Sequence, residues 1–330
     1  MGTGETVAVA SAPGKCILFG EHAVVYGQPA VAVALKQRLT VSMKPASSWS
    51  VDGSPLRPER HPHICMLKDR LLAGSDVSPM ALHIQADIPR ASGLGSSAAL
   101  SAAVSAALTH LLEPVHDLET QQLSEDAHLA EAHAQGGRAS PLDTSTSVEG
   151  GVVMLSDQRE SMGKWLYTRT LNTPEGERSW EVHAVQPTVE DVYLVLGSTG
   201  VHASTSKQVA MVAETLENDP SKQQHIDAIG AVARRGMVAL MEGDVEGVGR
   251  AMTENHLLLR QLGVSSPELE ALVQAAAPTA LGVKLTGAGG GGCMVALTRD
   301  PERTGQAIEL AGGRIFVSTL ANAGVKVETV

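Results

Sequence analysis

The hydrophobic and polar positions of the chain change period several times, and each change predicts a different element. Residues 81–87 alternate between apolar and polar side chains, which is the period of a half-buried strand. Residues 100–111 place apolar side chains every three to four positions among alanines, which indicates a buried helix. The glycine-rich run between them, residues 89–98, is therefore predicted to be a turn that leads directly into a helix.

The same patterns divide the rest of the chain. Strands are predicted at residues 6–11, 30–34, 39–43, 152–155, 180–185, 192–196, 283–286, 293–297, 314–317 and 325–330. Helices are predicted at residues 64–72, 118–135, 205–217, 222–242 and 244–261, with two more beginning at Ser266 and at Asp300. Residues 45–62 and 136–151 are rich in small residues and turn formers, so we expect loops there.

Long helices dominate after residues 186–198, and this shift in composition predicts two domains, residues 1–187 and 188–330. In the second half, two strands, a helix and two strands occur in that order, with further helices behind them. This order predicts an α+β unit of the ferredoxin-like type.

Composition and charge restrict the partners. With 25 Lys and Arg against 36 Asp and Glu the formal charge is -11, and only eight residues are aromatic, so we expect no nucleic acid partner. No apolar run reaches the roughly 20 residues that cross a bilayer, and the first residues lack the features of a signal peptide. Three widely spaced cysteines favour a reducing compartment. We therefore expect a cytoplasmic protein that binds no membrane.

The turn at residues 89–98 is a candidate phosphate site. A helix start carries unpaired N–H groups and a partial positive charge, and glycines let an anion approach these donors. Ser96 and Ser97 add hydroxyls that can bond phosphate oxygens or ligate a hard cation such as Mg²⁺. A capped turn without a ligand remains an alternative, because short motifs occur frequently by chance.

Three further residues are candidates for chemistry. Lys15 lies in a run of turn residues that is not a Walker loop, because Cys16 stands where Ser or Thr should follow the lysine. Glu131 lies near the C-terminal end of a predicted helix, where the helix dipole disfavours a carboxylate unless a cation such as a metal compensates. Asp143 is the acid of the second predicted loop, and it fits either a helix cap or a well-positioned base.

Two other patterns have weaker support. Gly93-x-Gly95-x-x-Ala98 and Gly287-x-Gly289-x-x-Gly292 formally fit the dinucleotide-binding fingerprint. The first follows several predicted antiparallel strands and the second precedes a strand, so a Rossmann enzyme is a second enzymatic hypothesis only. The segment His61-Pro-His-Ile-Cys65 resembles a zinc cluster but lacks a fourth ligand nearby.

Three separated runs carry a resemblance to a known family. They are SAPGKCILFGEHAVVYG from Ser11, PRASGLGSSAA from Pro89 and KLTGAGGGGC from Lys284. In this order they resemble the three motifs of the GHMP kinase superfamily. Within it, the first run and RASPLDTSTSVEGG are similar to the short archaeal and bacterial mevalonate kinases. The resemblance implies a ribosomal-protein-S5-like N-terminal domain and a ferredoxin-like α/β C-terminal domain. It further implies a homodimer that uses ATP and Mg²⁺ to phosphorylate the C5 hydroxyl of mevalonate.

The resemblance also implies a role for individual residues. Asp143 matches the catalytic base and Lys15 the lysine that contacts it and stabilises the reacting oxygens. Ser97 and Glu131 match the Mg²⁺ ligands. The ATP site is implied at Pro89, Ser92, Gly93, Leu94, Gly95, Ser96, Ser97 and Ala98, and the mevalonate pocket at Glu21, His22, Thr205, Gly287 and Ala288.

Two alternatives within this fold stay open. One is another small-molecule kinase of the superfamily, such as phosphomevalonate kinase, although His22 and the loop around Asp143 favour mevalonate. The other is a protein that binds a ligand without turnover, because a fold never establishes activity. The joint presence of Lys15, Ser97 and the two acids disfavours this second alternative.

Overall fold

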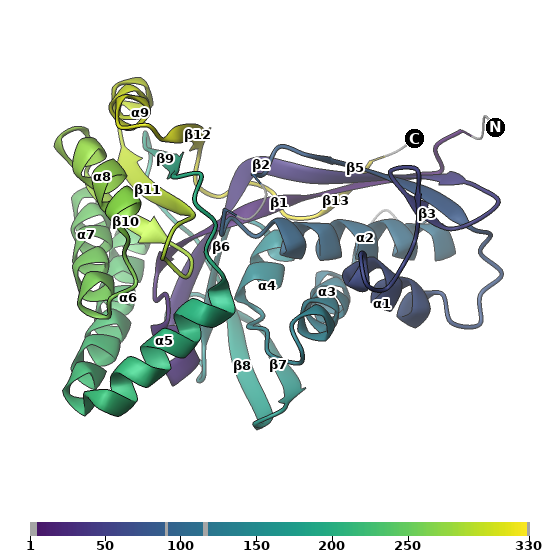
Figure 1. Cartoon of the computed structure of the whole chain (residues 1–330), viewed down its shortest axis with the longest axis horizontal. Helices are drawn as coiled ribbons and strands as arrows, with labels where there is room; N and C mark the ends of the chain where they lie inside the picture. The colour runs from purple at the N-terminus through teal and green to yellow at the C-terminus, as the bar shows by residue number, and fades with distance from the viewer. Residues whose placement is uncertain (1–4, 90–91, 115–117, 329–330) are drawn as a thin grey trace.

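The computed structural model describes residues 5–89, 92–114 and 118–328, and these residues form two β-sheets with helices packed against them (Figure 1). The first sheet contains β1 (Ala8–Phe19), β2 (Ala30–Pro45), β3 (Ser50–Val51), β4 (Ser54–Pro55), β5 (Met80–Ala86), β6 (Val152–Ser156), β7 (Lys164–Thr173), β8 (Gly176–Val185) and β13 (Lys326–Glu328). The second contains β9 (Tyr193–Ser198), β10 (Gly282–Thr286), β11 (Cys293–Thr298) and β12 (Arg314–Ser318).

The helices divide between the two sheets in the order of the chain. Those beside the first sheet are α1 (Pro62–Leu71), α2 (Ser96–Leu112), α3 (Thr120–Ala134) and α4 (Leu142–Glu149). The half of the chain that forms the second sheet contains α5 (Thr205–Asn218), α6 (Gln223–Glu242), α7 (Val245–Gln261), α8 (Pro267–Ala276) and α9 (Pro301–Leu310). The predicted α+β class is confirmed.

The long strand β2 is the centre of the first sheet, because it pairs with β1, β5 and β6. We predicted two strands here, residues 30–34 and 39–43, and this is wrong. The first part of β2 is buried, whereas Lys36 is exposed and Gln37 partly exposed, and the pairing with β1 shifts register between Ala34 and Arg38, so the hydrophobic pattern is interrupted although the strand runs on. A change of environment along one strand therefore resembled a break between two.

Helix α2 is buried along most of its length, between the first sheet and helices α1, α3 and α4. Its buried positions are mainly alanines and serines, and small side chains let a helix approach a sheet and other helices closely. This packing fixes the start of α2, and the glycine turn before it lies against the third motif, since a Cβ atom at Gly292 would be 3.0 Å from the carbonyl oxygen of Ser92.

The segment at residues 136–151 was predicted as a loop, and this is wrong because residues 142–149 form α4. Serines and threonines give this stretch a low helix propensity. Helix α4 is nevertheless formed because its tertiary contacts with α2 and α3 bury most of it. The strand β7 and the short hairpin of β3 and β4 were also missed.

The last strand was predicted to close the second sheet, and this is wrong. Strand β13 runs antiparallel to β1 in the first sheet, with Val9 opposite Glu328, and so covers an edge of β1 that is otherwise unpaired. Residues 329 and 330 of the predicted strand lie outside the described residues. Strands β9 to β12 still give the ferredoxin-like order, and the chain changes sheet between β8 and β9, where the predicted boundary lies. The two-domain division stays a prediction.

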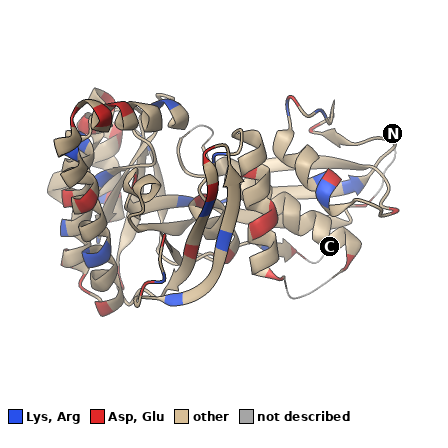
Figure 2. Cartoon of the chain, turned by 90° about the horizontal axis from the view of Figure 1, so that it is seen from below, with Lys and Arg blue, Asp and Glu red and all other residues tan. Residues whose placement is uncertain are grey.

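The hypothesis of a Rossmann enzyme is wrong, because the strand before the glycine turn, β5, belongs to an antiparallel part of the sheet. Strand β5 pairs antiparallel with β2, whereas a dinucleotide fold needs parallel βαβ units. The helices around the second sheet carry both basic and acidic residues, which are mixed over their surface (Figure 2). Among the described helices, none is both long and apolar enough to span a bilayer.

Candidate active site

Lys15 reaches from β1 to the glycine turn and to α4. Its side chain is almost fully buried, and its Nζ atom donates a hydrogen bond of 3.0 Å to the carbonyl of Gly93. The same atom lies 3.1 Å from a carboxylate oxygen of Asp143. The pairing of β1 with β2 shifts register between Pro13 and Lys15, where β2 carries the extra residues. The structure therefore brings the predicted ammonium and the predicted acid together beside the turn.

The start of α2 is shaped by Gly95. Its φ is +73°, and a Cβ atom there would lie 2.8 Å from Cγ of Lys15, so only glycine allows both this turn and the path of the lysine. Gly95 offers no capping side chain, and the first intrahelical bond runs from Ala99 N to Gly95 O. The N–H groups of the three preceding residues, Ser96 to Ala98, thus precede the helical hydrogen bonds and are available to an anion.

The other residues predicted for the ATP site are placed differently. Leu94 and Ser92 are buried, and the Ser92 hydroxyl donates to the carbonyl of Pro89 at 2.8 Å. These two side chains support the turn from inside, and the carbonyl of Leu94 also accepts a hydrogen bond of 2.9 Å from the amide of Lys15.

Asp143 is the second residue of α4, and its side chain is 40% exposed, whereas the following residues, from Thr144 to Val148, are buried. The cap interpretation is wrong, because Pro141 occupies the cap position. A carboxylate in the first turn instead lies close to the positive end of the helix. The buried helix therefore holds one exposed acid against Lys15.

Glu131 is buried and contacts three other side chains. Its Oε1 atom lies 3.2 Å from Nε2 of His63, and Gln135 donates a hydrogen bond of 2.7 Å to Oε2. Burial alone raises the pKa of Glu131, but the hydrogen bond and charge of His63 and hydrogen bonds from Ser97 and Gln135 outweigh it, so the pKa is lowered. A carboxylate beside a serine hydroxyl is a set of hard oxygen ligands, which fits Mg²⁺.

Both carboxylate oxygens of Glu21 are bound by neighbouring side chains. It is 2% exposed, forms an ion pair with Lys284 of β10, and accepts a hydrogen bond of 3.0 Å from Asn255 of α7. Lys284 is fully buried and also donates to the carbonyls of Ile17 and Leu285. Burial raises the pKa of Glu21, against the charge of Lys284. This network joins the first motif to the third.

His22 follows in a tight turn with a φ of +61°, a conformation that non-glycine residues rarely adopt. Its Nε2 atom lies 2.9 Å from the carbonyl oxygen of Ala288. A carbonyl only accepts, so Nε2 carries the proton and Nδ1 is an acceptor. Burial lowers the pKa of His22, which favours this neutral form. The structure thus places His22 beside the predicted residues Gly287 and Ala288.

The third motif also meets the first. Thr286, directly before Gly287, accepts a hydrogen bond of 3.0 Å from the amide of Ile17. Thr205 is exposed at the start of α5, and the segment before it contacts the third motif through Gly292, whose amide donates to the carbonyl of Val201 at 2.8 Å. Its substrate role stays a prediction.

Sequence reasoning missed three residues of this region, namely His63, Asn255 and Lys284. Lys284 begins the third motif, but nothing in the motif indicates that it is buried. Asn255 is a polar residue on the apolar face of α7, which is a signal that the sequence carries. His63 belongs to the histidine and cysteine segment that we interpreted as a zinc cluster or, with more support, as the approach to the helix predicted at residues 64–72.

The cysteines near Lys15 are expected to be chemically inert. Burial raises the pKa of Cys16 to about 11 and that of Cys293 to about 12, so neither is a thiolate at neutral pH. At pH 8 we expect an aromatic disulfide reagent to label at most Cys65 in the native protein and all three cysteines in guanidinium. A Cys65→Ser variant should then show no native labelling; rapid labelling of this variant would contradict the burial of the other two.

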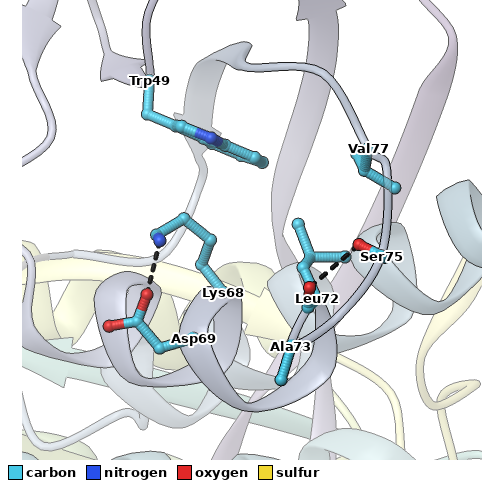
Figure 3. Close-up of a pocket in the computed structure, with 7 residues that line it drawn as sticks. All are labelled: Trp49, Lys68, Asp69, Leu72, Ala73, Ser75 and Val77. Carbon is cyan, nitrogen blue, oxygen red and sulfur yellow. Dashed lines mark hydrogen bonds and ion pairs between the residues drawn. The ribbon is translucent and has the colours of Figure 1, made fainter.

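A separate cavity of about 250 Å³ lies at the C-terminal end of α1, lined by Trp49, Lys68, Asp69, Leu72, Ala73, Ser75 and Val77 (Figure 3). Lys68 is paired with Asp69, and its Nζ lies 5.9 Å from the centre of the Trp49 ring. The lining includes none of the predicted catalytic, nucleotide or metal residues, so this cavity is not part of the candidate site.

Comparisons with known proteins agree with this geometry. Sequence models of the GHMP kinase N-terminal and C-terminal domains match residues 63–151 and 237–311. A mevalonate kinase of Methanothermobacter thermautotrophicus is 35% identical, with 87% of this chain and 89% of that protein covered. One of Archaeoglobus fulgidus is 34% identical, with coverage of 91% and 99%. The crystal structure of L. major mevalonate kinase in complex with R-mevalonate is 25% identical, with a TM-score of 0.75 and coverage of 97% and 98%.

Proposed function

The chain belongs to the GHMP kinase family, and from this premise we propose that it transfers the γ-phosphoryl group of ATP to the C5 hydroxyl of (R)-mevalonate. The product is 5-phosphomevalonate. Two archaeal relatives of nearly full-length coverage carry the name mevalonate kinase. The observation that carries the proposal is the pairing of Lys15 with Asp143 at 3.1 Å beside the uncapped start of α2.

Each group has a role that phosphoryl transfer needs. Catalysis of phosphoryl transfer consists mainly of positioning the reactants and stabilising charge. The N–H groups at the start of α2 hold the phosphates in position. Asp143 orients the attacking hydroxyl and takes its proton. Lys15 lies against both the acid and the turn, so its charge stabilises the oxygen that attacks and the group that is transferred.

The residues on the substrate side fit a hydroxyl compound. His22 presents Nδ1 as an acceptor, which suits a hydroxyl of mevalonate, and its contact with Ala288 holds it against the third motif. Glu21 acts through its position in the network with Lys284, because both carboxylate oxygens already have partners.

Ser97 and Glu131 fit a Mg²⁺ ion, which when bound neutralises the β- and γ-phosphate oxygens. A homodimer follows from the family resemblance, and a cytoplasmic location from the three unpaired cysteines. Both stay predictions.

The activity is tested by a coupled assay of ADP release with mevalonate, phosphomevalonate, galactose and homoserine in parallel. We expect turnover with mevalonate at least about 100-fold faster than with the other three, because a pocket that hydrogen-bonds one hydroxyl compound rejects analogues that leave buried polar groups unpaired. Faster turnover of phosphomevalonate would favour the related kinase instead. ATP binding without turnover of any acceptor would favour a protein that only binds its ligand.

Replacing Lys15 with Met is expected to lower kcat about 100- to 1,000-fold, which is the usual effect of removing one donor at a developing charge. The KM for ATP should change only a few-fold, because the amides of α2 remain. Steady-state kinetics check this, with Lys164→Met on the exposed part of β7 as the control. If kcat is retained and ATP affinity is lost, Lys15 serves binding alone.

A further inference from the structure

His63 lies in the first turn of α1 and contacts the buried carboxylate of Glu131 on α3, 68 positions later in the chain. The side chain of His63 is 18% exposed, and that of Glu131 is 6% exposed, so this contact is made in the interior of the N-terminal half. His63 belongs to none of the three motif runs, and the proposed function gives it no role.

The two oxygens of Glu131 are held by different partners. Nε2 of His63 lies 3.2 Å from Oε1, whereas Gln135 of the same helix end donates to Oε2 at 2.7 Å. One partner comes from another helix and the other from the end of α3, so each oxygen of the carboxylate has a neighbour, His63 by an ion-pair contact and Gln135 by a hydrogen bond. The hydroxyl of Ser97 reaches the same group from the start of α2.

The position of Glu131 makes such support necessary. It lies in the last turn of α3, where the helix dipole disfavours a negative charge, and burial disfavours it further. A carboxylate that must stay charged and point at a cation therefore needs a donor from elsewhere in the fold. Groups that orient a metal ligand in this way typically change metal affinity about 10- to 100-fold when they are removed.

We propose that His63 is a positioning residue for the divalent cation of this protein, because it holds Oε1 of Glu131 in the orientation that lets the carboxylate and Ser97 ligate one ion. This inference rests on the proposed kinase function. His63 does not touch the substrate or the phosphates in this arrangement. It acts on the ion only through Glu131.

The test measures direct binding of Mn²⁺ to the full chain in the presence of saturating ADP. The electron paramagnetic resonance signal of free Mn²⁺ reports how much of the ion remains unbound. We expect His63→Leu to weaken Mn²⁺ binding about tenfold. His63→Gln, which keeps an N–H donor of similar reach, should stay within about twofold of the wild type. His133→Leu is the matched control, since His133 is an exposed histidine two residues from Glu131 on the same helix.

Two outcomes would overturn the proposal. The first is unchanged Mn²⁺ affinity in His63→Leu, and the second is an equal loss in His63→Leu and His63→Gln, which would show that the donor does not matter. Thermal unfolding of each variant identifies a loss of fold. If His63→Leu does not fold, His63→Asn, which is polar but too short to reach Glu131, takes its place with the same expected loss.

A second readout separates this inference from the proposed function. The Mg²⁺ concentration for half-maximal activity should rise about tenfold in His63→Leu while the KM for mevalonate stays the same. The Mn²⁺ measurement needs no turnover, so an inactive protein that binds Mn²⁺ and ADP would remove the proposed function but leave the role of His63 testable. Normal kinase activity with unchanged metal affinity in His63→Leu would remove only the role of His63.

Discussion

Asp143→Asn is expected to lower kcat at least about 1,000-fold, which lies within the range for loss of a general base. Asparagine has the same shape but cannot accept the proton of the hydroxyl, and it removes the negative charge that faces Lys15 at 3.1 Å. The fold should be retained, because the Asp143 side chain is 40% exposed, asparagine has the same shape, and Nζ of Lys15 keeps its hydrogen bond to the carbonyl of Gly93.

The measurement is ADP release under saturating ATP and mevalonate, together with ATP affinity and the melting temperature of the variant. ATP affinity should stay within a few-fold of the wild type, because the phosphates are held by α2 and not by α4. Asp76→Asn, in an exposed segment away from Lys15, is the control. A variant at position 143 that retained more than a tenth of the wild-type rate would remove Asp143 from the chemistry.

Lys284→Met is expected to lower the free energy of unfolding by about 3 to 5 kcal/mol, the usual cost of removing one partner of a buried ion pair. Lys284 is fully buried, and without it Asn255 is the one side-chain partner that the described residues leave to the carboxylate of Glu21. The carbonyls of Ile17 and Leu285 lose a donor as well. Urea unfolding measures the loss.

The double variant Lys284→Met with Glu21→Gln provides the decisive comparison. It removes both charges, so much of the lost stability should return, because neutral groups in the interior do not carry the cost of an unpaired ion. The two single variants and the double variant form a cycle that isolates the interaction between the partners. A loss below about 1 kcal/mol in Lys284→Met, or no recovery in the double variant, would show that this pair does not join the two halves as described.

The individual elements could largely be predicted from local pattern, because each depends on neighbouring residues. The alternation before the glycine turn predicts β5, and the apolar period after it predicts α2. Two of the predicted helices begin at Asp244 and Asp300, and these side chains cap them by accepting hydrogen bonds from the amides of Gly247 and Arg303. Failures occurred where tertiary contacts outweigh local preference, as in α4, whose serines and threonines disfavour the helix that its burial stabilises.

The candidate site shows the same division. Three ordered motifs imply which residues meet, and the structure brings Lys15, Asp143 and the glycine turn together. The sequence did not indicate that Glu21 forms a buried ion pair with Lys284, or that His63 contacts Glu131. These contacts join residues 263 and 68 positions apart, and no local pattern records such distances.

The sequence by itself determined the type of most elements, the α+β class and the order of the motifs, since periodicity and capping act over a few residues. Only the tertiary structure decided that β13 returns to the first sheet, that Thr205 is exposed at the start of α5, and that three side chains surround the buried acid on α3. Edge pairing and buried charge are settled by the whole fold, because unpaired backbone groups and isolated ions are unfavourable wherever along the chain their partners lie.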